Sequence, residues 1–205
     1  IDNSEPSLYK VNQKISSQND KFINLRVVLG DVNDKGLIEM ILSEENIDIV
    51  FHAAAYKHVP LVELNPITAL KNNVFSTYVI CKNALKYKIP KVILISSDKA
   101  VRPSNIMGAS KRLSEMILQA YADTQNNYVG KDKNTFTNFS MVRFGNVLGS
   151  SGSVVPLFKE QISNGGPVTI TDEEMIRYAK ELGFDRNSDK GVDFLARFNG
   201  KYIIG

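Results

Sequence analysis

The sequence predicts an α/β protein with a doubly wound parallel sheet. Short runs rich in β-branched residues alternate with longer segments of helical spacing along most of the chain. This alternation is typical of a parallel sheet with helices on its faces. Small or polar residues follow the ends of several predicted strands, and such sheets bind their ligands at those ends. A length of 205 residues is enough for one sizeable core.

The first half of the chain contains two predicted strands and two predicted helices. Residues 25–29 form an apolar run, and a helix is expected at 37–42 because the turn residues before it are followed by helical spacing of Leu and Ile. The next strand is expected at 47–54. A proline then opens a long helix at 66–87.

The second half continues this order until the pattern loosens. A largely apolar strand is expected at 91–96, a second long helix at 107–121 and a further strand at 137–143. Beyond them we expect a helix at 154–163 and a short strand at 168–170. The apolar face of the second long helix is predicted to consist of Leu113, Met116, Ile117 and Ala120.

Composition excludes several classes of protein. Charged residues make up 23% of the chain, with a formal net charge of +3 and no block of like charges of the kind that binds nucleic acid. The single cysteine, Cys81, allows no disulfide within the chain, and only two histidines are present, so a zinc site is not expected. No apolar run reaches the roughly 20 residues that span a bilayer. We therefore expect a cytoplasmic protein.

The chain does not begin with Met, so we expect it to be a piece of a longer protein. Any membrane anchor would then lie in an upstream segment, and the longer protein would sit at the cytoplasmic face of the membrane. No partner follows from the small charge excess.

The ends of four consecutive predicted strands carry the candidate site residues. Asp31 follows the first strand, and three alanines end the second. The sequence Ser-Ser-Asp-Lys follows the third strand, and Arg-Phe-Gly-Asn follows the fourth. Because the carboxyl ends of parallel strands meet at one edge of the sheet, these groups are expected to surround one ligand site.

Several long motifs resemble the polysaccharide-biosynthesis branch of the extended short-chain dehydrogenases, the CapD-like UDP-N-acetylglucosamine 4,6-dehydratases. The Met-for-Tyr type of that branch is the nearest in pattern. The wider similarity runs from about residue 2 to about residue 178. The motifs are FHAAAYKHVPLVE at 51–63, NNVFST at 72–77, ISSDKAVRP at 95–103, NIMGASKR at 105–112 and VRFGNVLGSSGSVVP at 142–156.

The resemblance implies a Rossmann-like, NAD(P)-binding sheet and the start of a small substrate lobe. Residues 1–145 would form a partial dinucleotide-binding domain, without the first strand and the glycine-rich loop that receives the pyrophosphate. Residues 146–205 would form a partial substrate-binding region, with a divergent tail from about 179. The family also implies a UDP-sugar substrate and a homo-oligomer in the complete protein.

The resemblance assigns the chemistry to three consecutive residues. Ser97 would hydrogen-bond the C4 oxygen of the sugar, Asp98 would be the acid that assists loss of water, and Lys99 would be the base near C5. Burial could raise the pKa of Asp98 enough to keep it partly protonated. The alternative is an ordinary polar turn.

Met107 and Lys111 lie four residues apart and therefore share one face of a helix. In most short-chain dehydrogenases the first position is Tyr, which a thioether cannot replace as a base, and Met is typical of a branch of the dehydratases. The C4 base is then Lys111 or a chain of water molecules. The alternative for Met107 is a filler of the apolar core.

The resemblance also implies a set of cofactor contacts. Asp2 would bind the adenosine ribose hydroxyls, which favours NAD over NADP, and Lys111 would hold the nicotinamide ribose. A surface lysine is the alternative for Lys57, and no role is expected for His58. The implied cofactor residues are Asp2, Asp31, Val32, Ala53, Ala54, Ala55, Lys57 and Lys111.

Three residues would bind the sugar diphosphate. Asn146 would contact it directly, and the loop through Ser153 would offer backbone donors. Arg177 would pair with the pyrophosphate, for which the fork of a guanidinium is well suited. A solvated surface arginine is the alternative for Arg177.

The function implied by the resemblance is UDP-N-acetylglucosamine 4,6-dehydration with NAD, in surface or capsular polysaccharide synthesis, which would make the enzyme a lyase. A nucleotide-sugar epimerase or reductase of the same superfamily is the alternative enzyme, and Met107 with the Asp98–Lys99 pair disfavours it. A non-catalytic fragment is the alternative from another class. The sequence leaves the exact sugar and the C5 stereochemistry open.

Overall fold

The structure is a computed structural model, and it describes residues 1–17, 24–126, 136–145, 160, 163–164, 195–198 and 201–204. The chain divides into two compact units, Ile1–Gly145 and Asn146–Gly205. This boundary is also that of the predicted domains, whose cofactor and substrate roles stay predictions. The predicted helix at 154–163 and strand at 168–170 fall outside the described residues, apart from isolated positions.

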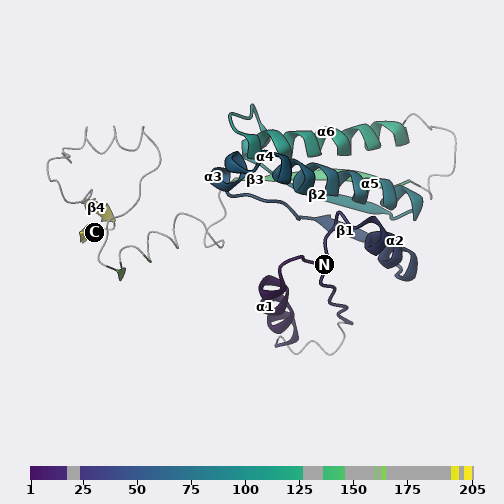
Figure 1. Ribbon diagram of the computed structural model, residues 1–205, viewed down its shortest axis with the longest axis horizontal. Coiled ribbons are helices and arrows are strands. Elements are labelled where there is room, and N and C mark those ends of the chain that lie inside the picture. The colour runs from purple at the N-terminus through teal and green to yellow at the C-terminus, as the bar shows by residue number, and fades with distance from the viewer. Residues whose placement is uncertain are drawn as a thin grey trace. The chain divides into compact units, whose positions relative to one another are not determined.

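The unit Ile1–Gly145 is built on a three-stranded parallel sheet in the order β1-β2-β3 (Figure 1). β1 is Ile49–His52, β2 is Lys91–Ser97 and β3 is Asn138–Phe144. All three strands occur where the sequence predicted them. Ser96 of β2 lies opposite Arg143 of β3 in the register of the sheet.

The predicted strand at 25–29 is reduced to a single parallel bridge between Asp2 and Leu29. The backbone N–H of Gly30 donates to the Asp2 carbonyl at 3.0 Å. A β-strand needs a neighbouring strand to hydrogen-bond with along its length. In the described part of the chain, only Asp2 pairs with this segment, so the pairing does not extend beyond one bridge. The bridge nevertheless fixes Asp2 beside the turn at Gly30.

Six helical segments precede β2 in the described part of the chain, and the sequence anticipated only some of them. α2, Lys35–Glu44, lies around the predicted helix, and its N-cap Asp34 accepts the Leu37 N–H at 3.1 Å. α1, Glu5–Ser16, and α3, Val59–Leu64, were not predicted, although each has a proline in its first turn.

The long helix predicted at 66–87 is broken by a π-helical turn. α4, Pro66–Leu70, passes into a π-helix at Lys71–Phe75, and α5, Ser76–Lys86, follows it. The prediction of one continuous α-helix was wrong at this point. A π-turn inserts one residue into the helical ladder, and such turns occur frequently at functional sites.

The helix after the short 3₁₀ turn Asp98–Ala100 is α6, Ile106–Asn126. Its buried face is largely polar, although it includes the apolar Met107 and Leu118. Leu113 and Met116, which were placed on the apolar face of this helix, are 43% and 51% exposed. Beyond Met107 and Gly108 at its start, the buried positions of the helix are Ser110, Lys111, Ser114, Glu115 and Leu118. Polar burial is tolerated here because each of these polar side chains has hydrogen-bond partners.

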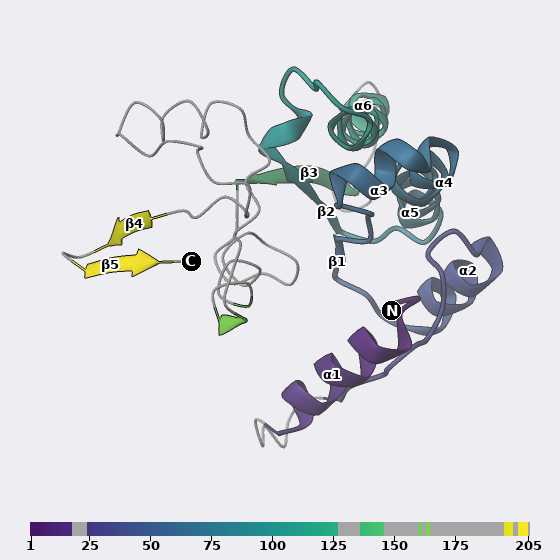
Figure 2. The ribbon, with the colours of Figure 1, turned by 60° about the vertical axis from the view of Figure 1, so that its left-hand side comes forward.

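The main hydrophobic core lies between the sheet and the helices on one side of it. Figure 2 shows α4, α5 and α6 grouped on that side of the strands. The core contains Ile38, Leu42, Val79, Ile80, Cys81, Ala84, Ile89, Val92, Leu94 and Leu118. The opposite sheet face carries exposed apolar side chains, including Phe51 at 66% and Phe144 at 47%.

The unit Asn146–Gly205 contains one described strand pair. β4, Leu195–Phe198, and β5, Lys201–Ile204, are antiparallel, with Leu195 opposite Ile204. The sequence predicted no element there. Among the residues described in either unit, no helix combines the length and apolar character needed to cross a membrane.

Gly108 allows α6 to dock closely on the turn at the end of β2. A methyl group at Gly108 would overlap the backbone carbonyl oxygen of Lys99 and would lie 3.2 Å from Cβ of Pro103. The start of α6 is also tied down, because Asn105 Oδ1 accepts the Gly108 N–H at 2.8 Å and Glu63 Oε1 accepts the Ile106 N–H at 2.6 Å. Only glycine therefore fits at this contact.

We expect Gly108→Ala to lower the melting temperature, with a loss of roughly 1–3 kcal/mol, because backbone rather than a flexible side chain must move. Gly36→Ala is the matched control in the first turn of α2, where the nearest atom, Asp34 Oδ1, is 3.4 Å from the new methyl. That change should stabilise the protein slightly. Thermal unfolding of both variants checks the contrast, and equal effects would contradict the close contact at Gly108.

His52 ends β1 as a buried side chain that contacts α5. Its Nε2 lies 3.1 Å from Thr77 Oγ1 and 3.3 Å from Ser76 Oγ. Burial, with a further contribution from the charge on Lys111, lowers the pKa of His52 from 6.5 to about 4. The folded protein therefore holds a neutral imidazole at this position.

The free energy of unfolding should fall as the pH is lowered from about 6.5 toward 4, by up to about 1.4 kcal/mol per pH unit. The unfolded chain takes up a proton on His52 near the ordinary pKa, whereas the folded chain resists protonation down to about pH 4. His52→Gln keeps an amide for the two hydroxyls but does not titrate, so its stability should vary less over this range. Urea unfolding across the pH series measures this, and parallel curves for both proteins would contradict it.

Candidate functional site

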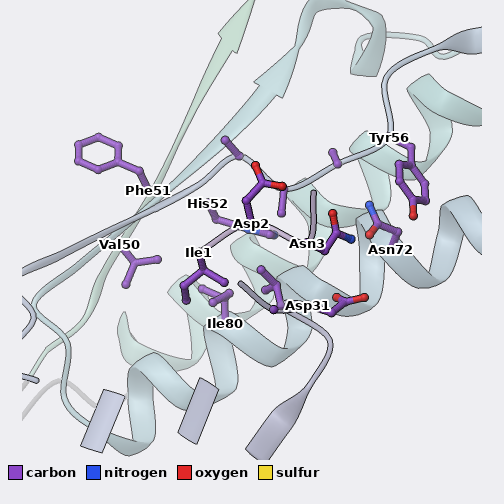
Figure 3. A pocket seen from close by; sticks show the side chains of 15 residues that line it. Ile1, Asp2, Asn3, Asp31, Val50, Phe51, His52, Tyr56, Asn72 and Ile80 are labelled. Atoms are coloured by element: carbon purple, nitrogen blue, oxygen red, sulfur yellow. The ribbon is translucent and has the colours of Figure 1, made fainter. Parts of the chain in front are cut away.

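A pocket of about 420 Å³ opens at the carboxyl end of β1 and beside the chain start. Figure 3 shows Asp2, Asp31 and His52 arranged around it. The predicted cofactor residues that line the pocket are Asp2, Asp31, Val32, Ala53, Ala54 and Ala55. Lys57 and Lys111 are not among its lining residues.

The two acidic residues of the pocket are held by local turns. Asp2 Oδ1 accepts the Ser4 N–H at 2.8 Å, and Asp31 Oδ1 accepts the Asn33 N–H at 2.8 Å. These bonds fix the direction of each carboxylate without burying it. Three consecutive alanines, Ala53 to Ala55, line the pocket without bulky side chains.

Sequence reasoning missed several lining residues, among them Asn3, Tyr56 and Asn72. Tyr56 and Asn72 lie within the family motifs, but the resemblance implied no role for either of them. Asn3 is the neighbour of Asp2, and nothing in the sequence distinguished it.

The polar turn after β2 brings three predicted catalytic residues into mutual contact. Ser97 Oγ donates to Asp98 Oδ1 at 2.9 Å and accepts the Lys99 N–H at 3.2 Å. Lys99 Nζ donates to the same Asp98 oxygen at 3.1 Å. A Cβ atom at Gly145 would lie 3.9 Å from Asp98 Oδ2, so the turn also lies next to the end of β3.

The pKa of Asp98 departs from expectation. Burial was expected to raise it, but the side chain is 55% exposed. Hydrogen bonds from Ser97 and then Lys99 lower the pKa of Asp98 instead. The prediction of a partly protonated Asp98 was therefore wrong for this ligand-free turn.

Lys111 is buried one turn into α6, and its Nζ donates to the Ile95 carbonyl at 2.9 Å. Burial lowers the pKa of Lys111 to about 8, although the nearby Glu115 carboxylate raises it. The lysine can therefore change protonation state close to neutral pH.

Met107 packs with Val62 and Ala69 in a small buried cluster. It has the environment that a core filler requires. Its role at the position of the usual tyrosine stays a prediction.

Asn73, within the π-turn, was not predicted as a site residue and is buried. Its side chain accepts the Tyr56 N–H at 2.7 Å, donates to the Tyr56 carbonyl at 3.1 Å and donates to Ser110 Oγ at 2.9 Å. It therefore joins the segment after β1 to α6. The signal in the sequence was the family motif NNVFST at 72–77, which contains Asn73.

Glu115 was also missed, and its side chain is fully buried. Its carboxylate accepts hydrogen bonds from Ser96 Oγ at 2.7 Å, from Arg143 Nε and Nη2 at 2.8 Å each, and from Arg112 Nη1 at 3.0 Å. Burial alone would raise the pKa of Glu115, but these bonds outweigh it and lower the pKa to about 2. The carboxylate stays ionised at neutral pH.

The predicted substrate residues Asn146, Ser153 and Arg177 lie outside the described residues, so their roles stay predictions. Within the ranges that are described, no group of three or more His, Cys, Asp or Glu side chains could hold a metal ion.

The chain matches the family described as polysaccharide biosynthesis protein over residues 1–183. It is 44% identical over 178 residues to the capsular polysaccharide biosynthesis protein CapD of Staphylococcus aureus, covering 87% of this chain and 28% of that protein. It is 39% identical over 155 residues to a UDP-N-acetylglucosamine 4,6-dehydratase (inverting) of Campylobacter jejuni, covering 75% and 44%. It is 38% identical over 158 residues to a UDP-glucose 4-epimerase of Rickettsia canadensis, a match that covers 77% of this chain and 44% of that protein. The chain thus spans less than half the length of these three relatives.

Solved structures agree on the fold. Pen from Bacillus thuringiensis superposes with a TM-score of 0.72 and 36% identity, covering 83% of this chain and 50% of that one. A dTDP-glucose 4,6-dehydratase of Streptomyces venezuelae, solved with NAD bound, gives a TM-score of 0.59 at 22% identity, covering 77% and 50%. The latter likeness shows the Rossmann-like fold alone. The predicted fold class and family resemblance are both confirmed, and this chain belongs to the polysaccharide biosynthesis protein family, whose relatives include nucleotide-sugar dehydratases and epimerases.

Proposed function

We propose that this chain is part of an NAD-dependent nucleotide-sugar 4,6-dehydratase that acts on UDP-N-acetylglucosamine. The observation that carries the proposal is the contact of an acid and a base, Asp98 and Lys99, on the turn after β2. Loss of water across C5 and C6 of a sugar requires a base for the C5 proton and an acid for the departing hydroxyl. Ser97, bonded to Asp98, adds a hydroxyl that can reach a substrate oxygen.

The residues around the pocket fit a dinucleotide. The pocket of about 420 Å³ is of the size that small-molecule sites have. Its alanines permit close approach of a ligand to the backbone, and the Asp2 carboxylate suits two ribose hydroxyls but would repel a phosphate on the ribose. This supports NAD over NADP. When bound, the nicotinamide would supply a hydride acceptor for C4 and return the hydride to C6.

The chain's own residues would orient the sugar and move protons. Ser97 would hold the C4 oxygen, Lys99 would take the C5 proton and Asp98 would give a proton to the C6 hydroxyl. Asp98 is ionised in the open turn, so a bound sugar must exclude water around it and thereby raise its pKa. The C4 proton would pass to Lys111 or to a chain of water molecules, and a pKa of about 8 supports a role for Lys111 in proton transfer.

A 4-epimerase is the second candidate, because the similarity to the Rickettsia enzyme is nearly as strong as that to the Campylobacter dehydratase. Both reactions need oxidation at C4, and only dehydration also needs an acid and a base near C5 and C6. Dehydration removes one water from the nucleotide sugar, whereas epimerisation leaves its mass unchanged.

We expect UDP-N-acetylglucosamine to lose one water when it is incubated with NAD and a version of this protein extended upstream through a glycine-rich loop. Mass spectrometry of the nucleotide sugar measures the loss, and this chain alone is run beside the extended version. An unchanged mass with conversion to the C4 epimer would favour the second candidate. An unaltered sugar with both proteins would refute both functions.

In the active version, Asp98→Asn should lower the rate of water loss by roughly 100-fold or more, because the amide cannot supply the proton. Asp48→Asn is the matched control, since this exposed residue directly precedes β1, at the opposite end of that strand from the pocket. Its rate should match that of the unchanged protein. A similar loss in both variants would mean that Asp98 has no special role in the reaction.

A further inference from the structure

Glu115 places a negative charge between α6 and the ends of two neighbouring strands. Its four hydrogen bonds come from β2 through Ser96, from β3 through Arg143 and from its own helix through Arg112. The arginine of β3 binds it through two parallel N–H groups, the geometry that fixes position as well as charge. Neither arginine is buried with it, since their side chains are 40% and 43% exposed.

The two strand residues that Glu115 joins are direct partners in the sheet. Ser96 lies opposite Arg143 in the parallel register. The next residue after Ser96 is Ser97, which begins the polar turn, and Gly145, which lies beside Asp98, follows Arg143 by two positions. The carboxylate therefore sets the spacing of the two strand ends immediately before the proposed site.

Glu115 also lies one helical turn after Lys111 and so shares its face of α6. Lys111 Nζ is held by the carbonyl of Ile95, the residue before Ser96. The titratable groups that act on Lys111 are Glu115 from its own helix and His52 from β1, which is neutral at pH 7. Among the described residues, Glu115 supplies the charge that offsets the burial of the Lys111 ammonium.

We propose that Glu115 is a positioning residue of the proposed dehydratase site, which fixes the ends of β2 and β3 against α6 and stabilises the protonated form of the buried Lys111. This inference rests on the proposed function for its catalytic meaning. The effect of the Glu115 charge on the pKa of Lys111 can be measured without turnover. Glu115 itself is not among the residues that line the pocket.

The test follows the titration of Lys111 by NMR of this chain labelled with ¹³C at lysine Cε. Lys111→Arg identifies the Lys111 signal by its disappearance. In Glu115→Gln, which keeps the shape but loses the charge, the Lys111 pKa should fall by about one pH unit. The matched control is Glu39→Gln, which removes a carboxylate that is paired with Lys86 on the surface, and it should leave Lys111 unchanged.

Arg112→Gln provides a second variant if Glu115→Gln does not fold. It removes an exposed partner of Glu115, so the negative charge acts more strongly on Lys111 and its pKa should rise. Opposite shifts in the two variants support the proposal, as does a rise in Arg112→Gln when only that variant folds. A Lys111 titration that is the same in the unchanged protein and in every folded variant would overturn it, because a merely structural ion pair would lower the melting temperature alone.

Turnover separates this inference from the function on which it rests. In the active extended version, a Lys111 that accepts the C4 proton must start as the neutral amine, so the acidic limb of the rate profile should move to lower pH in Glu115→Gln. Absence of water loss in the unchanged extended protein refutes the proposed function but leaves the NMR shifts to decide on Glu115. A profile limb that stays in place although the Lys111 signal shifts would overturn the link of Glu115 to the reaction.

Discussion

A buried carboxylate is the constraint on which the rest of this unit depends. Removing the charge of Glu115 from water is unfavourable unless donors surround it, and the available donors come from β2, β3 and α6. The carboxylate can be satisfied only when the strand ends and the helix take one relative position. A hydrophobic contact would tolerate a small slide of α6, whereas a two-pronged bond to Arg143 does not.

The same interface explains why α6 presents serines, a lysine and a glutamate to the protein interior. Gly108 lets the backbone of the helix meet the turn after β2, and Asn73 holds the segment after β1 to Ser110 of the helix. The segments after β1 and β2, which carry the proposed cofactor and catalytic residues, are thus both held against α6. Such rigid support is what a site needs when groups must be held to a fraction of an ångström.

The sequence predicted the alternation of strands and helices well, because β1, β2 and β3 are apolar runs bounded by turn residues. It failed where tertiary contacts override local pattern. Helical spacing placed Leu113 and Met116 on one apolar face of α6, but both are exposed because the hydrogen bonds of Glu115 and Ser114 turn another face inward. Motif resemblance indicated the polar turn and part of the pocket lining, yet it could not indicate the hydrogen bonds from Ser97 and Lys99 that lower the pKa of the exposed Asp98.

The π-turn at Lys71–Phe75 gives the helix one more residue than a regular ladder would need. Deleting any single residue from this stretch would restore an ordinary α-helix and rotate its first half by about 100° relative to the second. The amide of Asn73 could then no longer face both Tyr56 and Ser110. A one-residue gap at this position in the sequence of a relative would therefore mark a protein whose segment after β1 is held in some other way.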